Sequence, residues 1–137
     1  MKALLLAVTA VCALGPALAD DLHGVDRILC SAVSATICTV DGECETDLPY
    51  NWNIPQFIEI DLARKTLSTT KASGENRSTP AASLARADGW IYLQGVEAGR
   101  AFSFVIDETT GLVSIAVARK GLTVSVFGAC TVMPPTK

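Results

Sequence analysis

Hydrophobic and polar residues alternate along much of the chain beyond residue 26. Phe102, Phe104 and Ile106 alternate with smaller residues, and the same period of two recurs over 56–62 and 122–131. A period of two places every second side chain on one face of a β-strand. Beyond the first nineteen residues, no window of the sequence carries a convincing helical stripe. The pattern therefore predicts an all-β chain.

Turn signals separate the alternating runs at short intervals. Dipeptides that end in glycine are typical of tight hairpin turns, and the chain has them at Asp41-Gly42, Asp88-Gly89, Ala98-Gly99, Thr110-Gly111 and Lys120-Gly121. We expect strands at 27–39, 43–46, 56–62, 66–71, 81–87, 90–95, 100–107, 112–118 and 122–131. The segments 47–55 and 72–80 are predicted to be the longer connections.

About eight or nine short strands in sequential order predict an antiparallel meander. Such a meander leaves exposed edges unless the sheet closes, so we expect an up-and-down barrel, with a two-sheet sandwich as the alternative. A barrel of about eight strands is either filled by side chains or holds one small ligand. We expect a filled interior, because the sequence supplies many apolar side chains for it: Ile58, Ile60, Leu93, Phe102, Phe104, Ile106, Ile115, Val117, Val124 and Val126.

The first nineteen residues have the order of a secretory signal peptide. Lys2 precedes an apolar run over 4–14, and Ala17-Leu18-Ala19 places small residues at a cleavage site. The apolar run is shorter than the roughly 20 residues that a membrane-spanning helix needs. We expect cleavage before Asp20, which leaves residues 20–137 as a single β domain without a transmembrane segment. The predicted location is periplasmic or secreted.

Four cysteines remain beyond the predicted cleavage site, and an exported chain meets an oxidising compartment. Four cysteines allow three disulfide connectivities. A three-residue hairpin loop over 40–42 would place Cys38 opposite Cys44 on neighbouring strands, close enough for a bridge. We therefore predict Cys38–Cys44, which leaves Cys30 to pair with Cys130 and tie the first strand to the last. This geometry discriminates only weakly against the other two connectivities.

The charge of the chain is acidic and unevenly distributed. Loss of Lys2 with the signal peptide leaves ten basic and fourteen acidic residues, a net charge of −4. Nucleic-acid binding needs a concentrated basic face, so we expect no nucleic-acid partner. Asp41, Glu43 and Glu45 lie in a stretch without Lys or Arg. They form either a solvated hairpin surface or a docking surface for a basic partner.

The sequence carries no strong catalytic or metal-binding motif. Its one histidine, His23, lies in what we expect to be a loose terminus, whereas a catalytic base must be held rigidly. Glu59 and Asp61 share one strand face, as a carboxylate-based hydrolase would need, but the solvent face of an amphipathic strand has the same pattern. We therefore expect a non-catalytic protein with no cofactor and no bound metal.

The segment 49–55 is the strongest candidate for a functional surface. It places Tyr50 and Trp52 between two prolines. Tyrosine and tryptophan are favoured interface anchors because they bury much area with little loss of entropy. The segment is either a lid over one end of the barrel or a recognition surface. With the acidic hairpin it gives a predicted partner-binding set of Tyr50, Trp52, Asp41, Glu43 and Glu45.

Several short runs of the chain look familiar: 57–62 with 65–70, Phe104-Val105-Ile106-Asp107 with Thr110-Gly111, and the ending Phe127-Gly128-Ala129-Cys130. Together they resemble small exported bacterial proteins that carry no assigned function. The resemblance implies a shared β-rich fold and no functional residues. In architecture the chain is also similar to small periplasmic barrels that inhibit lysozymes or proteases, although their inhibitory motifs are absent from this sequence.

Three functional hypotheses follow from the sequence. The first is an exported, non-catalytic module that binds an envelope or extracellular protein, in the manner of an inhibitor. The second is a carrier of a small molecule or lipid in a barrel cavity. The third, with the least support, is a carboxylate-based hydrolase that uses Glu59 and Asp61.

Overall fold

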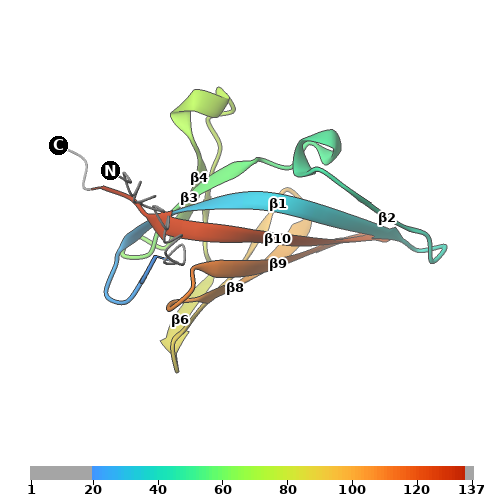
Figure 1. Cartoon of the computed structure of the whole chain (residues 1–137). Helices are drawn as coiled ribbons and strands as arrows, with labels where there is room; N and C mark the ends of the chain where they lie inside the picture. Colours follow the sequence, from blue (N-terminus) through green and yellow to red (C-terminus); the bar gives the residue numbers. More distant parts are fainter. Residues whose placement is uncertain (1–19, 135–137) are drawn as a thin grey trace, which may run out of the picture.

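The computed structural model describes residues 20–134, which form one curled antiparallel sheet (Figure 1). The predicted signal peptide, residues 1–19, lies outside the described residues. Two short 3-10 helices interrupt the strands, η1 (Pro49–Trp52) and η2 (Lys71–Ser73). The strands are β1 (Arg27–Thr39), β2 (Cys44–Asp47), β3 (Phe57–Asp61), β4 (Thr66–Thr69), β5 (Ser78–Pro80), β6 (Ser83–Ala87), β7 (Trp90–Glu97), β8 (Arg100–Asp107), β9 (Leu112–Arg119) and β10 (Leu122–Val132).

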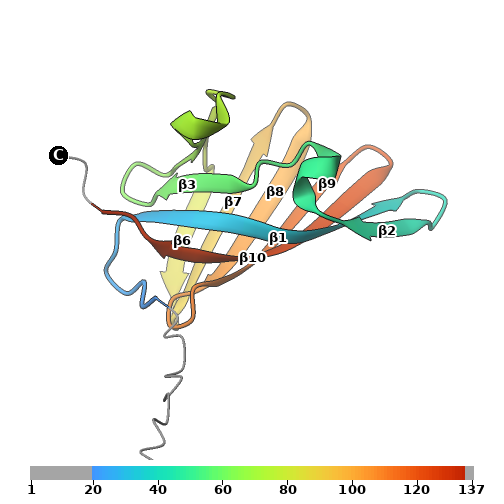
Figure 2. The same cartoon turned by 45° about the horizontal axis from the view of Figure 1, so that its top comes forward.

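The long strand β1 lies at the centre of the sheet. The strand order is β5-β4-β3-β1-β10-β9-β8-β7-β6, and every pairing is antiparallel. One edge of β1 pairs with β3 over 27–31 and with β2 over 35–38, while the other edge pairs with β10. Figure 2 shows β7, β8 and β9 running steeply across the direction of β1. The predicted antiparallel meander is thus confirmed, as a sheet that curls into a half-barrel.

All nine predicted strands are present, and β1 and β8 have the predicted bounds. The prediction was wrong for 72–80, which contains most of η2 and the tenth strand, β5. Pro80 ends this strand at the edge of the sheet, where a residue that cannot donate a ladder hydrogen bond is tolerated. A three-residue strand that ends in proline carries almost no alternating pattern, so the sequence did not reveal it.

The two edge strands of the half-barrel, β5 and β6, share no backbone pairing within residues 20–134. Side chains connect this gap instead. The hydroxyl of Thr79 in β5 donates a hydrogen bond to Glu97 at the end of β7 (2.7 Å). Arg77, just before β5, donates a second hydrogen bond to the same carboxylate (2.8 Å).

Both predicted disulfides are confirmed. Cys30 and Cys130 lie directly opposite each other in the β1–β10 register and form one bridge. Cys38 and Cys44 lie opposite each other in the β1–β2 hairpin and form the other. The first bridge joins residues 100 positions apart, so it ties the first strand of the domain to the last.

Apolar side chains fill one end of the half-barrel, which we call the filled end. Its fully buried large residues are Leu22, Ile28, Ile60, Ile91, Leu93 and Ile106. Leu22 comes from the segment before β1, and its backbone N–H donates to the carbonyl of Glu108 (2.7 Å). The expected loose terminus is therefore wrong from residue 22, because burial of this leucine anchors the segment. Within the described residues, no helix has the length and apolar character to span a bilayer.

A bulge in β1 changes which side chains face the interior. The β1–β10 register shifts between Ala32 and Ser34. Before the shift Ile28 and Cys30 face inward, and after it Ala35 is buried and Ile37 lines the interior. Gly128 makes the shift possible, since a Cβ on it would lie 2.0 Å from the Ser31 carbonyl oxygen. Classic bulges bend a strand in this way, and β1 reaches past the filled end to line a second region of the interior.

Candidate functional site

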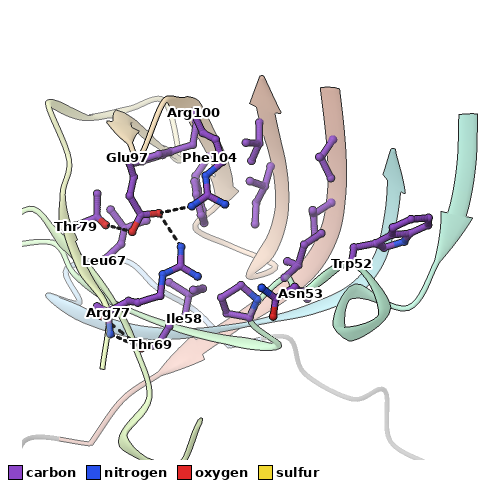
Figure 3. Close-up of a pocket in the computed structure, with 18 of the residues that line it drawn as sticks. Trp52, Asn53, Ile58, Leu67, Thr69, Arg77, Thr79, Glu97, Arg100 and Phe104 are labelled. Atoms are coloured by element: carbon purple, nitrogen blue, oxygen red, sulfur yellow. Dashed lines mark hydrogen bonds and ion pairs between the residues drawn. The ribbon is translucent and has the colours of Figure 1, made fainter. Parts of the chain in front are cut away.

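The other end of the half-barrel, which we call the hollow end, contains an open pocket of about 250 Å³ (Figure 3). Apolar side chains from β1, β3, β4, β8, β9 and β10 line most of it. The predicted filled interior is therefore correct for the filled end and wrong for the hollow end. Seven of the side chains expected to fill the core line the pocket: Ile58, Phe102, Phe104, Ile115, Val117, Val124 and Val126. Phe104, Val124 and Val126 are nevertheless buried, as predicted for core residues.

In β7, β8 and β9 the inward-facing side chains become less buried from the filled end to the hollow end. In β9, Val113 is 3% exposed, Ile115 and Val117 are half-buried, and Arg119 is exposed. Neighbouring strands follow the same gradient, since Phe104 lies opposite Ile115 and Phe102 lies opposite Val117. The pocket is therefore the continuation of the core, at the level where side chains no longer meet across the barrel.

Phe102 shapes the floor of the pocket. A Cβ on Gly95 would lie 2.4 Å from the tip of the Phe102 ring, so the ring rests on the bare backbone of β7. Phe102 also meets Phe104 edge to face, with ring centroids 5.8 Å apart and planes at 85°. This is a favourable arrangement of aromatic rings. The glycine thus lets the tip of the ring approach the backbone of β7 closely.

The segment 52–55 borders the pocket, and its Trp52 lies on the side away from Arg77 and Arg100 (Figure 3). Trp52 ends η1, is half-buried, and packs against the apolar cluster of Ala35, Val124 and Val126. Its indole Nε1 is buried and has no hydrogen-bond partner among residues 20–134. Asn53 follows in a left-handed conformation (φ 56°), which ends η1 and directs the chain toward β3.

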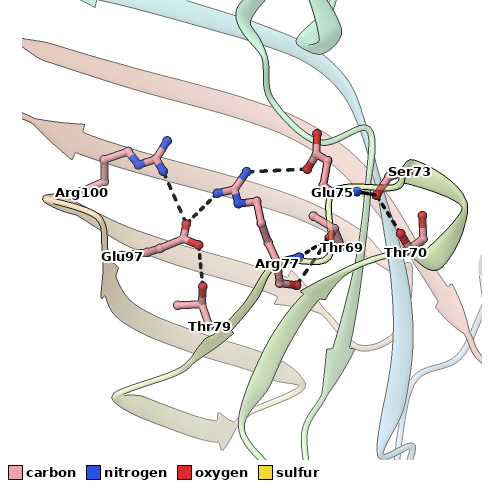
Figure 4. A network of polar contacts seen from close by, with 8 residues as sticks. All are labelled: Thr69, Thr70, Ser73, Glu75, Arg77, Thr79, Glu97 and Arg100. Carbon is pink, nitrogen blue, oxygen red and sulfur yellow. Dashed lines mark hydrogen bonds and ion pairs between the residues drawn. The ribbon is translucent and has the colours of Figure 1, made fainter.

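Charged side chains gather on the opposite side of the pocket. Glu97 accepts hydrogen bonds from Thr79 (2.7 Å) and Arg77 (2.8 Å), and Arg100 lies 3.7 Å from the same carboxylate (Figure 4). Arg77 is itself held in place, because its backbone N–H donates to the Thr69 hydroxyl (2.9 Å). We call Arg77, Glu97, Arg100 and Arg119 the charged rim, and all four line the pocket.

The hydrogen bond from Thr79, the hydrogen bond from Arg77 and the positive charges of Arg77 and Arg100 hold the pKa of Glu97 below its ordinary value. Partial burial opposes this shift and does not overcome it. Glu97 is therefore an anion at neutral pH. Its negative charge and that of Glu75, which lies 3.7 Å from Arg77, stand against the three positive charges of the rim arginines (Figure 4).

The predicted partner-binding residues lie in two different environments. Asp41, Glu43 and Glu45 are exposed on the β1–β2 hairpin and its loop, and Tyr50 is 63% exposed on η1. Trp52 is set apart from these four, because it lines the pocket. The structure thus divides the set into an outer surface of the hairpin and one residue of the hollow end.

The remaining titratable candidates lie away from the hollow end. His23 hydrogen-bonds the carboxylate of Asp21, and this contact raises the pKa of His23. Glu59 lies 3.8 Å from Arg27, and Asp61 accepts a hydrogen bond from the backbone of Arg64. Both carboxylates line a separate polar cavity of about 260 Å³ together with these arginines. In residues 20–134 no cluster of three or more His, Cys, Asp or Glu is placed to hold a metal ion.

The arginine residues of the charged rim were missed in the sequence, although a signal for them was present. Two of them, Arg100 and Arg119, continue the inward-facing period of two of their strands, whereas Arg77 precedes β5. Arg100 extends the series Phe104, Phe102 in β8, and Arg119 extends the series Ile115, Val117 in β9. A charged residue at the end of an inward series marks the mouth of a barrel.

We found no match to this chain among protein-family models, curated proteins or solved structures.

Proposed function

We propose that the protein binds a small, largely apolar molecule in the pocket at its hollow end and acts as a carrier for it. The observation that carries this proposal is the open 250 Å³ pocket with an apolar floor and a charged rim. Binding sites for small molecules combine an apolar lining with a few convergent polar groups. Among the three functions considered from the sequence, a carrier is the one that uses the pocket.

The size of the pocket limits the ligand. Its volume of about 250 Å³ lies just below the roughly 300–1,000 Å³ of typical pockets for drug-sized molecules. A ligand that fits is therefore small, or it is a narrow chain whose polar end stays outside the apolar part. A filled barrel end would have no room for either, so the open floor beside Phe102 is the essential feature.

A neutral solvatochromic dye, Nile red, tests this proposal without involving the charged rim. We expect the wild-type protein to bind the dye with a blue shift in emission, and Val117→Trp to lose that binding because the indole would fill the pocket. Ala118→Trp is the matched control, since Ala118 is the next residue of β9 and is exposed on the outer face. Circular dichroism of each variant establishes that the fold is retained.

Two results would argue against a carrier. One is a wild-type protein that gives neither a blue shift over a titration to saturating dye nor a heat of binding with a single-chain hydrocarbon probe such as dodecanoate. The other is binding that survives in a folded Val117→Trp variant, which would place the dye elsewhere. Should Val117→Trp fail to fold, Gly95→Ala replaces it, because the added methyl would push the Phe102 ring up into the pocket.

A second function, binding of an envelope or extracellular protein, is supported by the outer surface of the hairpin. On the segment 40–50, Val40 is 82% exposed and Leu48 is 48% exposed, and the carboxylates of Glu43 and Glu45 and the Tyr50 ring are exposed as well. Exposed apolar and aromatic groups with acidic neighbours are typical of a surface for a basic partner.

A comparison of Tyr50→Ala with wild type in a pull-down from periplasmic extract tests the protein-binding function. Tyr50 is the right position because it is exposed, whereas Trp52 also contributes to the pocket. A partner retained by wild type and lost from Tyr50→Ala supports this function. Equal retention by both proteins, or no retained partner, counts against it.

A further inference from the structure

The charged rim has an excess of positive charge on a chain that is acidic as a whole. The full sequence has a formal net charge of −3, yet the pocket is lined by three arginines and only one acidic residue, Glu97. The lining therefore has a formal charge of +2, and Glu75, which is outside the lining and 3.7 Å from Arg77, reduces this excess to +1. This local excess is a property of the site, because the rest of the chain has the opposite sign.

Glu97 does not neutralise the rim evenly. Its short contacts are with Thr79 and with Arg77, and Arg100 is more distant at 3.7 Å. Arg119 forms no ion pair and no hydrogen bond through its side chain with any residue in 20–134. The negative charge is thus concentrated at the Arg77 side, and the positive charge is uncompensated at the Arg119 side.

Arg100 and Arg119 are neighbours across two strands. Ala101 lies opposite Ala118 in the β8–β9 register, so the next position along the two strands pairs Arg100 with Arg119. Like charges directly opposite each other in a sheet are destabilising. An anion between the two guanidinium groups would remove this repulsion, and arginine is well suited to it because its planar fork matches carboxylate and phosphate oxygens.

The anion site continues directly into the apolar floor. Arg100 is two residues from Phe102 on the inward face of β8, and Arg119 is two residues from Val117 on the inward face of β9. A ligand with its charge between these arginines would place whatever is attached to it over Phe102 and Val117. The pocket therefore has cationic side chains at its mouth and apolar side chains at its floor. This arrangement matches a molecule with one anionic end and one hydrocarbon end.

We propose that the ligand is a single-chain amphiphile whose carboxylate or phosphate head binds between Arg100 and Arg119 and whose hydrocarbon tail enters the pocket. This inference rests on the proposed carrier function and specifies its ligand. Arg119 is the principal anchor, because its charge is uncompensated. Arg100 shares its charge with Glu97 and contributes less.

Displacement of bound Nile red by four probes of matched chemistry tests the inference. The probes are dodecanoate, dodecyl phosphate, dodecanol and inorganic phosphate, at constant pH and ionic strength. We expect one or both anionic amphiphiles to displace the dye at about tenfold lower concentration than dodecanol. A gain in affinity of about tenfold is what one charge-assisted hydrogen bond to the head group would contribute. The ratio of dodecanoate to dodecyl phosphate identifies the head group.

Arg119→Gln should raise by about tenfold the concentration of anionic amphiphile that displaces Nile red. The concentration of dodecanol that displaces the dye should stay the same. Lys120→Gln is the matched control, because it removes the same charge from the adjacent residue, which does not line the pocket. An equal effect of both substitutions would mean that only the overall charge matters, and this would overturn the inference.

The remaining outcomes separate this inference from the carrier function. Displacement by dodecanol as strong as by the anionic amphiphiles would overturn the inference and leave the carrier function in place. Competition by inorganic phosphate as strong as by dodecanoate would also overturn it, since the tail would then contribute nothing. If Nile red does not bind, direct calorimetric titration of dodecanoate is the measurement: no heat of binding rejects both proposals, and binding weakened by Arg119→Gln supports the inference.

Discussion

The filled end and the hollow end are built from the same strands, yet they differ in what lies between those strands. At the filled end Ile91 and Ile106 are fully buried, and Leu22 from the amino-terminal segment closes the space. At the hollow end β7, β8 and β9 carry Glu97, Arg100 and Arg119 around an open pocket. A meander can thus form a packed core at one end of its strands and an open pocket at the other.

The physical origin of the difference is the segment that covers each end. Leu22 enters the filled end and is held by a backbone hydrogen bond to Glu108, while the Glu108 side chain pairs with Arg86 (3.4 Å). The segment that borders the hollow end turns Trp52 against its wall and leaves the floor above Phe102 open. The amino-terminal segment with Leu22 thus fills the space at its end, whereas the segment with Trp52 only borders the pocket at the other end.

The two disulfides give the largest expected contrast between the ends. Cys30–Cys130 belongs to the core cluster of the filled end and joins residues 100 positions apart. Cys38–Cys44 closes the β1–β2 hairpin with a separation of 6. Chain entropy predicts a loss of about 4.7 kcal/mol for removal of the long bridge and about 2 kcal/mol for the short one.

Urea unfolding of the two double serine variants, Cys30→Ser/Cys130→Ser and Cys38→Ser/Cys44→Ser, measures this contrast. The free energies of unfolding should fall in the order wild type, short-bridge variant, long-bridge variant. Equal losses would mean that the long bridge does not restrict the unfolded chain, and the division of stability between the two ends would lose its main support.

Removal of apolar side-chain groups should lower the free energy of unfolding more at the filled end than at the hollow end. Leu22→Ala should cost about 2–5 kcal/mol, because it leaves a cavity in a packed core. Val117→Ala should cost about 1 kcal/mol or less, because this half-buried side chain already borders an open pocket. Urea titrations of both variants provide the comparison, and a Val117→Ala loss as large as that of Leu22→Ala would show that the hollow end is packed in solution.

The sequence predicted the fold better than it predicted the site, for reasons that particular residues make clear. The alternation of Phe102, Phe104 and Ile106 and the glycine turns are local signals, and they located nine strands and the Cys38–Cys44 hairpin. The pocket depends on distances across the barrel, such as the space between Phe102 and the segment 52–55. No local pattern contains those distances, so the same apolar residues predicted a filled interior.

The charged rim shows the same limit. The sequence shows Arg119 as one basic residue among others. Its proposed role depends on a position beside Arg100, which follows from the pairing of Ala101 with Ala118 in the β8–β9 register. The link between Arg77 and Glu97 joins residues 20 positions apart across the open edge of the sheet. This contact depends on how far the half-barrel curls. The alternation of hydrophobic and polar residues in the sequence does not determine that curvature.

The contribution of Glu97 to the free energy of unfolding should depend on pH, and this is the smallest of the stability effects predicted for the two ends. The pKa of Glu97 is lowered in the folded protein, so its contribution is fully present above the ordinary value of 4.5 and is lost as the pH falls through the lowered folded pKa. Partly exposed ion pairs contribute about 0–1 kcal/mol. The stability difference between wild type and Glu97→Gln should therefore be largest at neutral pH and should shrink below pH 4.5.

Urea titrations of both proteins across this pH range measure that difference, and the subtraction removes the contributions of other carboxylates such as Asp21 and Asp107. A difference that stays constant down to the acid limit would mean that the carboxylate of Glu97 is not held by Thr79 and Arg77 in solution. If the stability difference between wild type and Glu97→Gln grew as the pH fell, the pKa of Glu97 would be raised in the folded protein, not lowered.

Titration with dodecanoate, followed in amide nitrogen–proton correlation spectra, tests the division between the two ends most directly. The account predicts saturable shifts for Phe102, Val117 and Arg119 at the hollow end, with Ile91 and Ile106 at the filled end unchanged. Saturable shifts confined to the acidic hairpin around Glu43, equal shifts at both ends, or no shifts at saturating dodecanoate would contradict it.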